Sequence, residues 1–461
     1  MDVRATLLLT LAATLPAACA LKSPPERADV QGEALPGLET PAAWSASGAA
    51  TAAVEDAWLA GFADPRLDAL VAEALANNPD LLAAAARVEQ AAAYVDAASS
   101  GLYPQVAAIG NISGKDSSSG TVDYGGLFAS WELDLWGKVR SGRETARLQL
   151  LSAELSTAYA QQSMAAMVAR AWFLASESRL QKGVADDMVT AAEKLVELAL
   201  QRQRVGIGNE YDVSVAQASL ATYRDVAEQL GLVYRQSVQA IETLVGRYPA
   251  AELDVPSALP NLPGPVPAGL PSELLERRPD VIAAERRVAA AFFRVQEAKA
   301  ARLPTIRLNT SFSSLSSDLV VLKERDDPVW GFGGRVSVPL YLGGGLKAEI
   351  AVRTAEQKEA VAEYGRAGAN AFSEVENALS ASFALEAREP LLVQAVTENE
   401  RALQLAETRY RVGSDDLRAV EQQQMRLFSA KSALLRVRSE QLVQRINLHL
   451  ALGGNFATAG S

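Results

Sequence analysis

The chain carries few of the side chains that catalysis or metal binding requires. His449 is the only histidine, so the sequence offers no multi-histidine metal site. No serine stands in a nucleophile-elbow motif, and neither a P-loop nor a dinucleotide fingerprint follows a strand pattern. The sequence therefore predicts a protein that is not an enzyme, uses no metal or other cofactor, and depends on a partner for energy.

Charged side chains that could act on ions gather in one short stretch near the C-terminus. Asp415, Asp416 and Glu421 flank the single base Arg418. Acids at the start of a helix stabilise its first turn through the helix dipole, which would account for Asp415 and Asp416. Several copies around a narrow opening would instead attract and hold cations. Both interpretations stay open, although Glu421 lies beyond a first turn.

Cys19, the only cysteine, is the candidate for a covalent modification. It follows Arg4, an apolar run over 5–15 and the small residues Ala17 and Ala18, a pattern typical of a signal peptide. We expect a signal peptide over 1–18 and a lipid on Cys19, which would anchor the chain to membrane lipids. Pro16 stands where such motifs usually have leucine, so an incidental cysteine in a discarded peptide is the alternative.

The elements that position these residues come from an internal duplication. Residues 73–104 recur at 273–304, with Pro79-Asp80 matching Pro279-Asp280. Farther along, Arg-Val-Gly at 204–206 recurs at 411–413, and Gly246 matches Gly453. The unit is too long for a solenoid repeat, so a duplicated subdomain is indicated.

Each copy has the same predicted order of elements: a helix, two strands, a very long helix, a turn and a returning helix. Alternation with a period of two predicts strands at about 105–113 and 124–136, and at about 305–314 and 330–341. Strong helix formers fill 137–205 and 346–412, enough for helices of about 100 Å. Pro390 predicts a break or kink near 387–391.

The remaining segments connect these copies. Residues 19–55 read as a lipidated N-terminal tether before a first repeat at 56–248. The connector 249–271 contains seven prolines, and a second repeat at 272–454 precedes the tail 455–461.

Net charge and the lengths of the apolar runs exclude further classes of function. The net charge of −11 argues against nucleic-acid binding. After residue 15 no run of eighteen apolar residues follows, so any membrane span would have to be built from strands. Four strands are too few to close a barrel, whereas three chains would supply twelve.

Several motifs resemble those of the TolC-like outer membrane factors, in their lipoprotein branch. They are Trp-Leu-Ala-Gly-Phe-Ala-Asp-Pro-Arg-Leu from Trp58, Ala-Asn-Asn-Pro-Asp-Leu from Ala76, Ser-Trp-Glu-Leu-Asp-Leu-Trp-Gly from Ser130 and Arg-Arg-Pro-Asp from Arg277. The resemblance implies a mainly α fold with membrane β: a homotrimer that shares a twelve-stranded outer-membrane β-barrel and extends a long α-helical barrel into the periplasm of a Gram-negative bacterium.

The resemblance also assigns roles to residues at the two helical tips. The implied periplasmic gate consists of Tyr410, Asp415, Asp416, Arg418 and Glu421. The implied contacts with a periplasmic adaptor (membrane fusion) protein are Val205, Gly206, Gly208, Val412 and Gly413. Glycines at a chain reversal are also explained by the turn alone, and Tyr410 by simple packing.

The function implied is that of the outer membrane channel of a tripartite efflux system, a passive duct for drugs, metals or other toxic solutes. Its implied partner in the inner membrane is a pump of the resistance-nodulation-division type. A type I protein secretion channel and a structural coiled-coil surface lipoprotein are the alternatives. The sequence does not encode the exported substrate, because a channel wall touches many solutes weakly.

Overall fold

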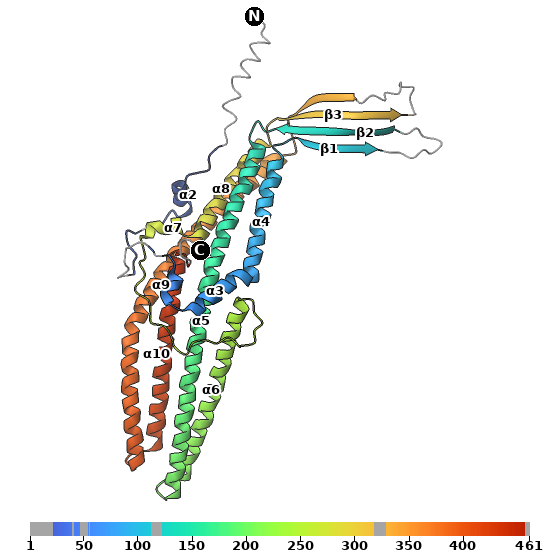
Figure 1. Cartoon of the computed structure of the whole chain (residues 1–461). Helices are drawn as coiled ribbons and strands as arrows, with labels where there is room; N and C mark the ends of the chain where they lie inside the picture. The colour runs from blue at the N-terminus through green and yellow to red at the C-terminus, as the bar shows by residue number, and fades with distance from the viewer. Residues whose placement is uncertain are drawn as a thin grey trace. The chain divides into compact units, whose positions relative to one another are not determined.

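Helices dominate the computed structural model, which describes residues 22–38, 41–46, 54, 56–111, 122–317 and 329–456 (Figure 1). The two longest are α5 (Lys138–Arg204, 67 residues) and α9 (Gly345–Val412, 68 residues). Each turns back into a second helix, α6 (Glu210–Leu244) or α10 (Leu417–Ala451). The shorter helices are α2 (Arg27–Ala34), η2 (Trp58–Phe62), α3 (Pro65–Asn77), α4 (Pro79–Ser100), η3 (Pro271–Glu273), α7 (Leu274–Arg277) and α8 (Pro279–Ala300). Cys19 lies outside the described residues.

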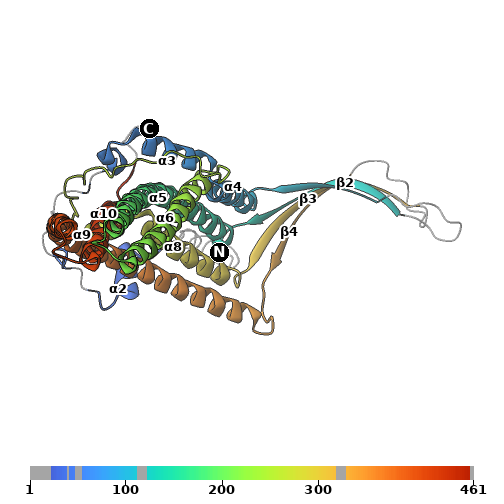
Figure 2. The same ribbon diagram turned by 90° about the horizontal axis from the view of Figure 1, so that it is seen from below.

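Four strands form one antiparallel sheet, which Figure 2 shows as a curved layer. They are β1 (Gln105–Asn111), β2 (Val122–Leu133), β3 (Thr305–Ser317) and β4 (Val329–Ser337). Their order in space is β1-β2-β3-β4, so β1 and β4 are the edges. The inner pair joins the two copies of the duplication, with Glu132 opposite Arg307.

The chain divides into two compact units, and each draws on both copies. The first is built mainly from Ala85–Ser156 and Asp280–Gly368, which include the sheet. The second is built mainly from Thr157–Pro279 and Ala369–Ser461 and contains the two hairpin tips. The duplication is therefore not a division into two separate domains.

A mixed aromatic and aliphatic core fills the end of the second unit where α3 and η2 pack. Trp172 on α5 is 1% exposed, and its indole Nε1 donates to Asp64 Oδ2 at 2.9 Å. Phe62 and Phe173 meet with ring centroids 5.0 Å apart. Burial of such side chains contributes roughly 1.5–3 kcal/mol each to folding. No described helix is both long enough and apolar enough to cross a membrane.

The structure differs from the sequence-based bounds at several points. β2 ends at Leu133 rather than 136, because the Asp134 carboxylate accepts from the Val139 and Arg140 amides that start α5. β4 ends at Ser337 rather than 341, just before Pro339, which has no N–H for a strand ladder. Within the segment predicted to be a tether, residues 27–34 form α2.

Of the break or kink predicted at Pro390, the break does not occur, since α9 runs through this proline as one helix. A proline removes a single helical hydrogen bond, and the surrounding turns keep theirs. Side chains of α10 also hold the adjacent turn: Arg438 Nε and Gln441 Nε2 donate to the Glu389 carboxylate at 2.9 and 3.1 Å.

Candidate functional site at the hairpin tips and on the sheet

The two helical hairpins end in turns of the same construction. At the first tip, the Gly206 amide donates to Gln203 O and the Ile207 amide to Arg202 O. At the second, the Gly413 amide donates to Tyr410 O and the Ser414 amide to Arg409 O. This pattern is a Schellman C-cap, which requires a left-handed residue, and Gly206 and Gly413 have φ of 78° and 81°. The Arg-Val-Gly repeat thus marks one turn built twice.

Each returning helix is also capped in the same way. The Asn209 side chain accepts from the Asp212 amide at 2.8 Å, and the Asp416 side chain accepts from the Ala419 amide at 3.0 Å. Such caps satisfy a free amide of the first turn. Asp416 therefore has a local structural role besides any role as a charge.

All four long helices contribute to a small core behind the tips. Equivalent positions of the duplication are buried in both copies, as Ala199 with Ala406 and Val213 with Val420 show. Tyr410 and Leu417 join this core at 1% and 2% exposure. The packing thus fixes the first hairpin against the second.

Arg202 of the first hairpin binds the end of the second. Its Nη1 donates to Tyr410 O at 2.5 Å and reaches Arg411 O at 3.5 Å, and its guanidinium lies 4.6 Å from the centre of the Tyr410 ring. The carbonyls at a helix C-terminus carry partial negative charge, so a cation there is stabilising. Arg202 therefore caps α9 from a neighbouring helix and covers an aromatic face.

Two further hydrogen-bonded links join the hairpins. Ser219 Oγ on α6 donates to Glu421 Oε1 on α10 at 2.8 Å. Farther from the tips, Gln181 Nε2 donates to Ser432 O at 2.9 Å, and Ser432 Oγ donates to Gln181 Oε1 at 2.5 Å. The second hairpin is thus tied to the first at several levels along the described helices.

The Tyr410 phenol is neutral and buried in this arrangement. Burial raises the pKa of Tyr410, the carboxylates of Asp212 and Glu421 raise it further, and Arg202 opposes them. The Tyr410 hydroxyl has no hydrogen-bond partner among the described residues. Within this chain the side chain contributes packing and a ring face that Arg202 covers.

The other predicted gate residues lie at the surface of the second tip. Asp415 is half-buried, whereas Asp416 and Arg418 are exposed, with Arg418 Nε 4.0 Å from Asp416 Oδ2. Glu421 is half-buried one helical turn after Leu417. Only Tyr410 and Glu421 of the predicted set belong to the contacts between hairpins.

The residues predicted to meet an adaptor are at the tips and mostly open to solvent. Val205 and Val412, at equivalent positions, are 71% and 72% exposed. Gly206 and Gly413 beside them are also exposed, and Gly208 is half-buried. A Cβ on Gly208 would lie 2.9 Å from the Gln203 nitrogen, so this glycine is required by the turn.

Sequence reasoning missed Arg202 and Ser219. The duplication aligns Arg202 with the exposed Arg409, so nothing in the sequence separates the two. Ser219 lies seven residues after Asp212, a spacing that places both on one face of α6. This spacing of two polar residues could have indicated a polar contact on that face of α6.

The lone histidine is structural. His449 is 8% exposed and stacks on Trp58, with ring centroids 5.8 Å apart. Burial, aided by the charge of Arg445, lowers the pKa of His449 to about 4. No group of acidic, histidine or cysteine side chains within the described ranges could hold a metal ion.

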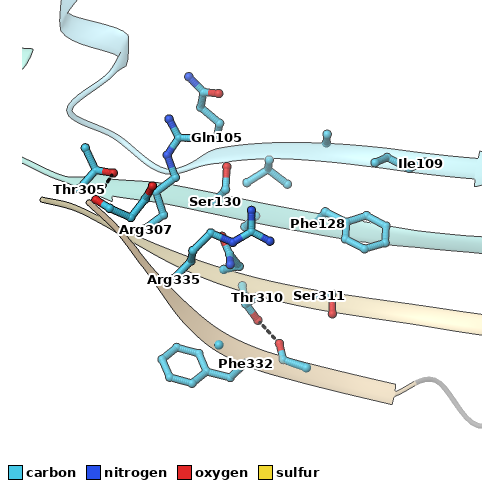
Figure 3. A pocket seen from close by; sticks show the side chains of 17 residues that line it. Gln105, Ile109, Phe128, Ser130, Thr305, Arg307, Thr310, Ser311, Phe332 and Arg335 are labelled. Atoms are coloured by element: carbon cyan, nitrogen blue, oxygen red, sulfur yellow. Dashed lines mark hydrogen bonds between the residues drawn. The ribbon is translucent and has the colours of Figure 1, made fainter. Parts of the chain in front are cut away.

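The sheet of the first unit has two chemically different faces. One presents apolar side chains: Val106, Leu127, Trp131, Phe312, Trp330 and Val336. The other is mainly polar: Gln105, Ser130, Asn309, Arg307 and Arg335, together with Ile109 and Phe128, surround a hollow of about 1030 Å³ (Figure 3). An apolar face towards lipid and a polar face towards water are what a transmembrane β-barrel requires.

Comparisons with known proteins agree with this geometry. The model of the outer membrane efflux protein family matches residues 70–247 and 270–454. The chain is 32% identical to the probable efflux pump outer membrane protein TtgC of Pseudomonas putida over 88% of the chain and 86% of TtgC. It is 31% identical to the pyoverdine export outer membrane protein OpmQ of Pseudomonas aeruginosa over 91% of the chain and 92% of OpmQ.

A solved structure with the same fold is the outer-membrane channel OprN. It superposes with a TM-score of 0.81 at 28% identity and covers 91% of this chain and 99% of OprN. The mainly helical fold with a few membrane strands, predicted from the sequence, is confirmed, as are the outer-membrane location and the class of efflux channel. With long helical hairpins, a two-faced sheet and family matches over both copies, the chain belongs to the outer membrane efflux protein family.

Proposed function

We propose that three copies of this chain form the exit duct of a tripartite efflux system. The observation that carries this proposal is the four-stranded sheet, with one apolar face, one polar face and two unpaired edges. Unpaired edges are avoided in membranes, and twelve strands make a barrel of ordinary size. Native mass spectrometry in detergent should give a trimer, and planar bilayers should show discrete conductance. A non-conducting monomer would refute the proposal.

In this proposal the second tip is the periplasmic gate. Three-fold symmetry would repeat Asp415, Asp416 and Glu421 around the opening, where carboxylates bind cations.

The gate is tested by neutralising these acids. Asp416→Asn is the preferred variant, because asparagine also caps helices and so removes the charge while keeping the turn. Combined with Asp415→Asn and Glu421→Gln, it should enlarge conductance and weaken block by divalent cations. Arg418→Gln, which removes the base of the set, should strengthen that block. Unchanged conductance and block would move the gate elsewhere.

Both tips are the proposed contact with a periplasmic adaptor. Val205 and Val412 offer exposed apolar side chains beside Gly206 and Gly413, where a partner backbone can approach closely. Val205→Asp with Val412→Asp should abolish site-directed crosslinking to an adaptor hairpin. Gln203→Ala, an exposed change on the same helix, is the control and should leave crosslinking intact.

The proposed inner-membrane partner is a pump of the resistance-nodulation-division type that exports small toxic solutes. The support is the family and its named relatives, which include an efflux pump component and a pyoverdine exporter. The chain is about equally identical in sequence to these relatives, whose names describe different export systems. This supports a channel wall that does not select one compound. Deletion in the source bacterium should raise sensitivity to several unrelated toxic compounds. Loss of one secreted protein without such sensitivity would favour type I secretion.

Lipid attachment at Cys19 remains a proposal, since this residue lies outside the described part of the chain. The signal-peptide pattern before it is the support. Cys19→Ala should abolish palmitate labelling, and continued labelling would refute the assignment.

A further inference from the structure

One row of side chains across the sheet carries three charges. The strand register sets Glu132 on β2 opposite Arg307 on β3, and Arg307 opposite Arg335 on β4. Residues directly opposite one another share a face, so all three lie on the polar face. Figure 3 shows Arg307 and Arg335 among the side chains that line the hollow.

The charges in this row do not balance. The Glu132 carboxylate accepts from Arg307 Nη2 at 2.8 Å and from Lys138 Nζ at 3.1 Å, so one acid serves two bases. Arg335 forms no ion pair with any residue that the structure describes. Within the row itself, two bases and one acid leave one positive charge per chain. Like charges directly opposite on neighbouring strands destabilise a sheet, so the Arg307–Arg335 pair has no evident structural benefit.

The strands that border Arg335 do not supply a missing acid. β4 itself reads VWGFGGRVS, without Asp or Glu. β1, the strand that would meet β4 of the next chain in a closed barrel, reads QVAAIGN and has none either. The other side chains that line this part of the hollow are neutral, among them Gln105, Ser130 and Asn309. Among the described residues of these strands, no carboxylate neutralises Arg335.

We propose that Arg307 and Arg335 form an anion-attracting band on the inner wall of the barrel, which draws in solutes bearing carboxylate or phosphate groups. This inference rests on the proposed function, because the polar face lines a pore only if the sheet closes into a barrel. Guanidinium groups bind such oxyanions through paired N–H donors. Arg335 is the group available for this contact, because Arg307 already donates to the Glu132 carboxylate and adds only its charge. The band is opposite in sign to the acidic second tip, so the duct favours anions at one level and cations at another.

The test is the charge selectivity of single channels in planar bilayers under a potassium chloride gradient. Arg335→Gln should lower the ratio of anion to cation permeability by about two- to threefold, the scale of a partly screened unit charge within a Debye length. Glu132→Gln should shift the ratio in the opposite direction, because it frees Arg307 and Lys138. Arg335→Lys keeps the charge and should preserve the wild-type ratio.

A titration with inorganic phosphate gives a second readout. Phosphate should reduce the wild-type chloride current at lower concentration than in Arg335→Gln. The proposed band would be refuted if wild type, Arg335→Gln and Glu132→Gln had the same ratio of anion to cation permeability and the same sensitivity to phosphate. Should Arg335→Gln fail to assemble, Glu132→Gln alone decides the sign. Absence of any conductance from the wild-type chain would instead refute the proposed function.

Discussion

The two hairpin tips are built on one plan, yet they present different chemistry. Both use a Schellman turn on a glycine with positive φ and a polar cap on the returning helix. At the first tip, position 203 is an exposed glutamine; its equivalent at the second tip is the buried Tyr410. Arg202 is drawn into contacts with the other hairpin, whereas its equivalent Arg409 is exposed. The two copies therefore share the turn, and the residues in which they differ, such as Gln203 and Tyr410, determine the contact between the hairpins.

The strongest test of this asymmetry is truncation of Tyr410. Tyr410→Ala should lower the local free energy of unfolding at the second tip by about 3–5 kcal/mol, the usual cost of emptying a buried aromatic site. Hydrogen exchange of the amides around Gly413 would measure it. Gln203→Ala, the equivalent change at the first tip, should have little effect. Equal loss of protection in both variants would contradict the asymmetry.

Arg202 provides the next largest expected effect. Arg202→Ala removes the charged donor to the carbonyls at the end of α9 and uncovers the Tyr410 ring, at a cost of about 2–3 kcal/mol. Conductance should rise because the second hairpin loses a tie to the first. Arg409→Ala is the matched control and should conduct like wild type. The contact would be shown to be irrelevant if both variants behaved alike.

Changes at the turn glycines should affect both tips equally. Gly206→Ala and Gly413→Ala each force a side chain into the left-handed region, at about 1–2 kcal/mol. Hydrogen exchange at the two tips should therefore show similar losses. A much larger loss at one tip would mean that the turns are not equivalent in strength.

The smallest expected effect belongs to the Tyr410 hydroxyl. Because this buried group has no partner among the described residues, Tyr410→Phe should change stability by no more than about 0.5 kcal/mol. Wild-type conductance in this variant would show that the packing of the Tyr410 ring, and not a hydrogen bond of its hydroxyl, distinguishes the second tip from the first. A marked opening of the channel would restore the hydroxyl as a latch.

Much of the architecture follows from the sequence by itself. Alternation of apolar and polar residues places the four strands, long proline-free stretches of helix formers place α5 and α6, and Arg-Val-Gly places both turns. These are local properties, determined by side-chain period, helix propensity and the left-handed freedom of glycine. The break that Pro390 allows does not occur, because the turns around one proline can hold a helix together.

The contacts that distinguish the tips were decided only by the tertiary structure. Arg202 and Arg409 are the same residue type at equivalent positions of the duplication, and only packing determines which one meets a helix end. The same holds for Arg335, whose lack of an acid partner depends on strand register rather than on composition. Local periodicity fixes elements and turns, whereas charge pairing depends on distances between residues about two hundred positions apart. The chain alone does not specify those distances until its helices and strands have packed.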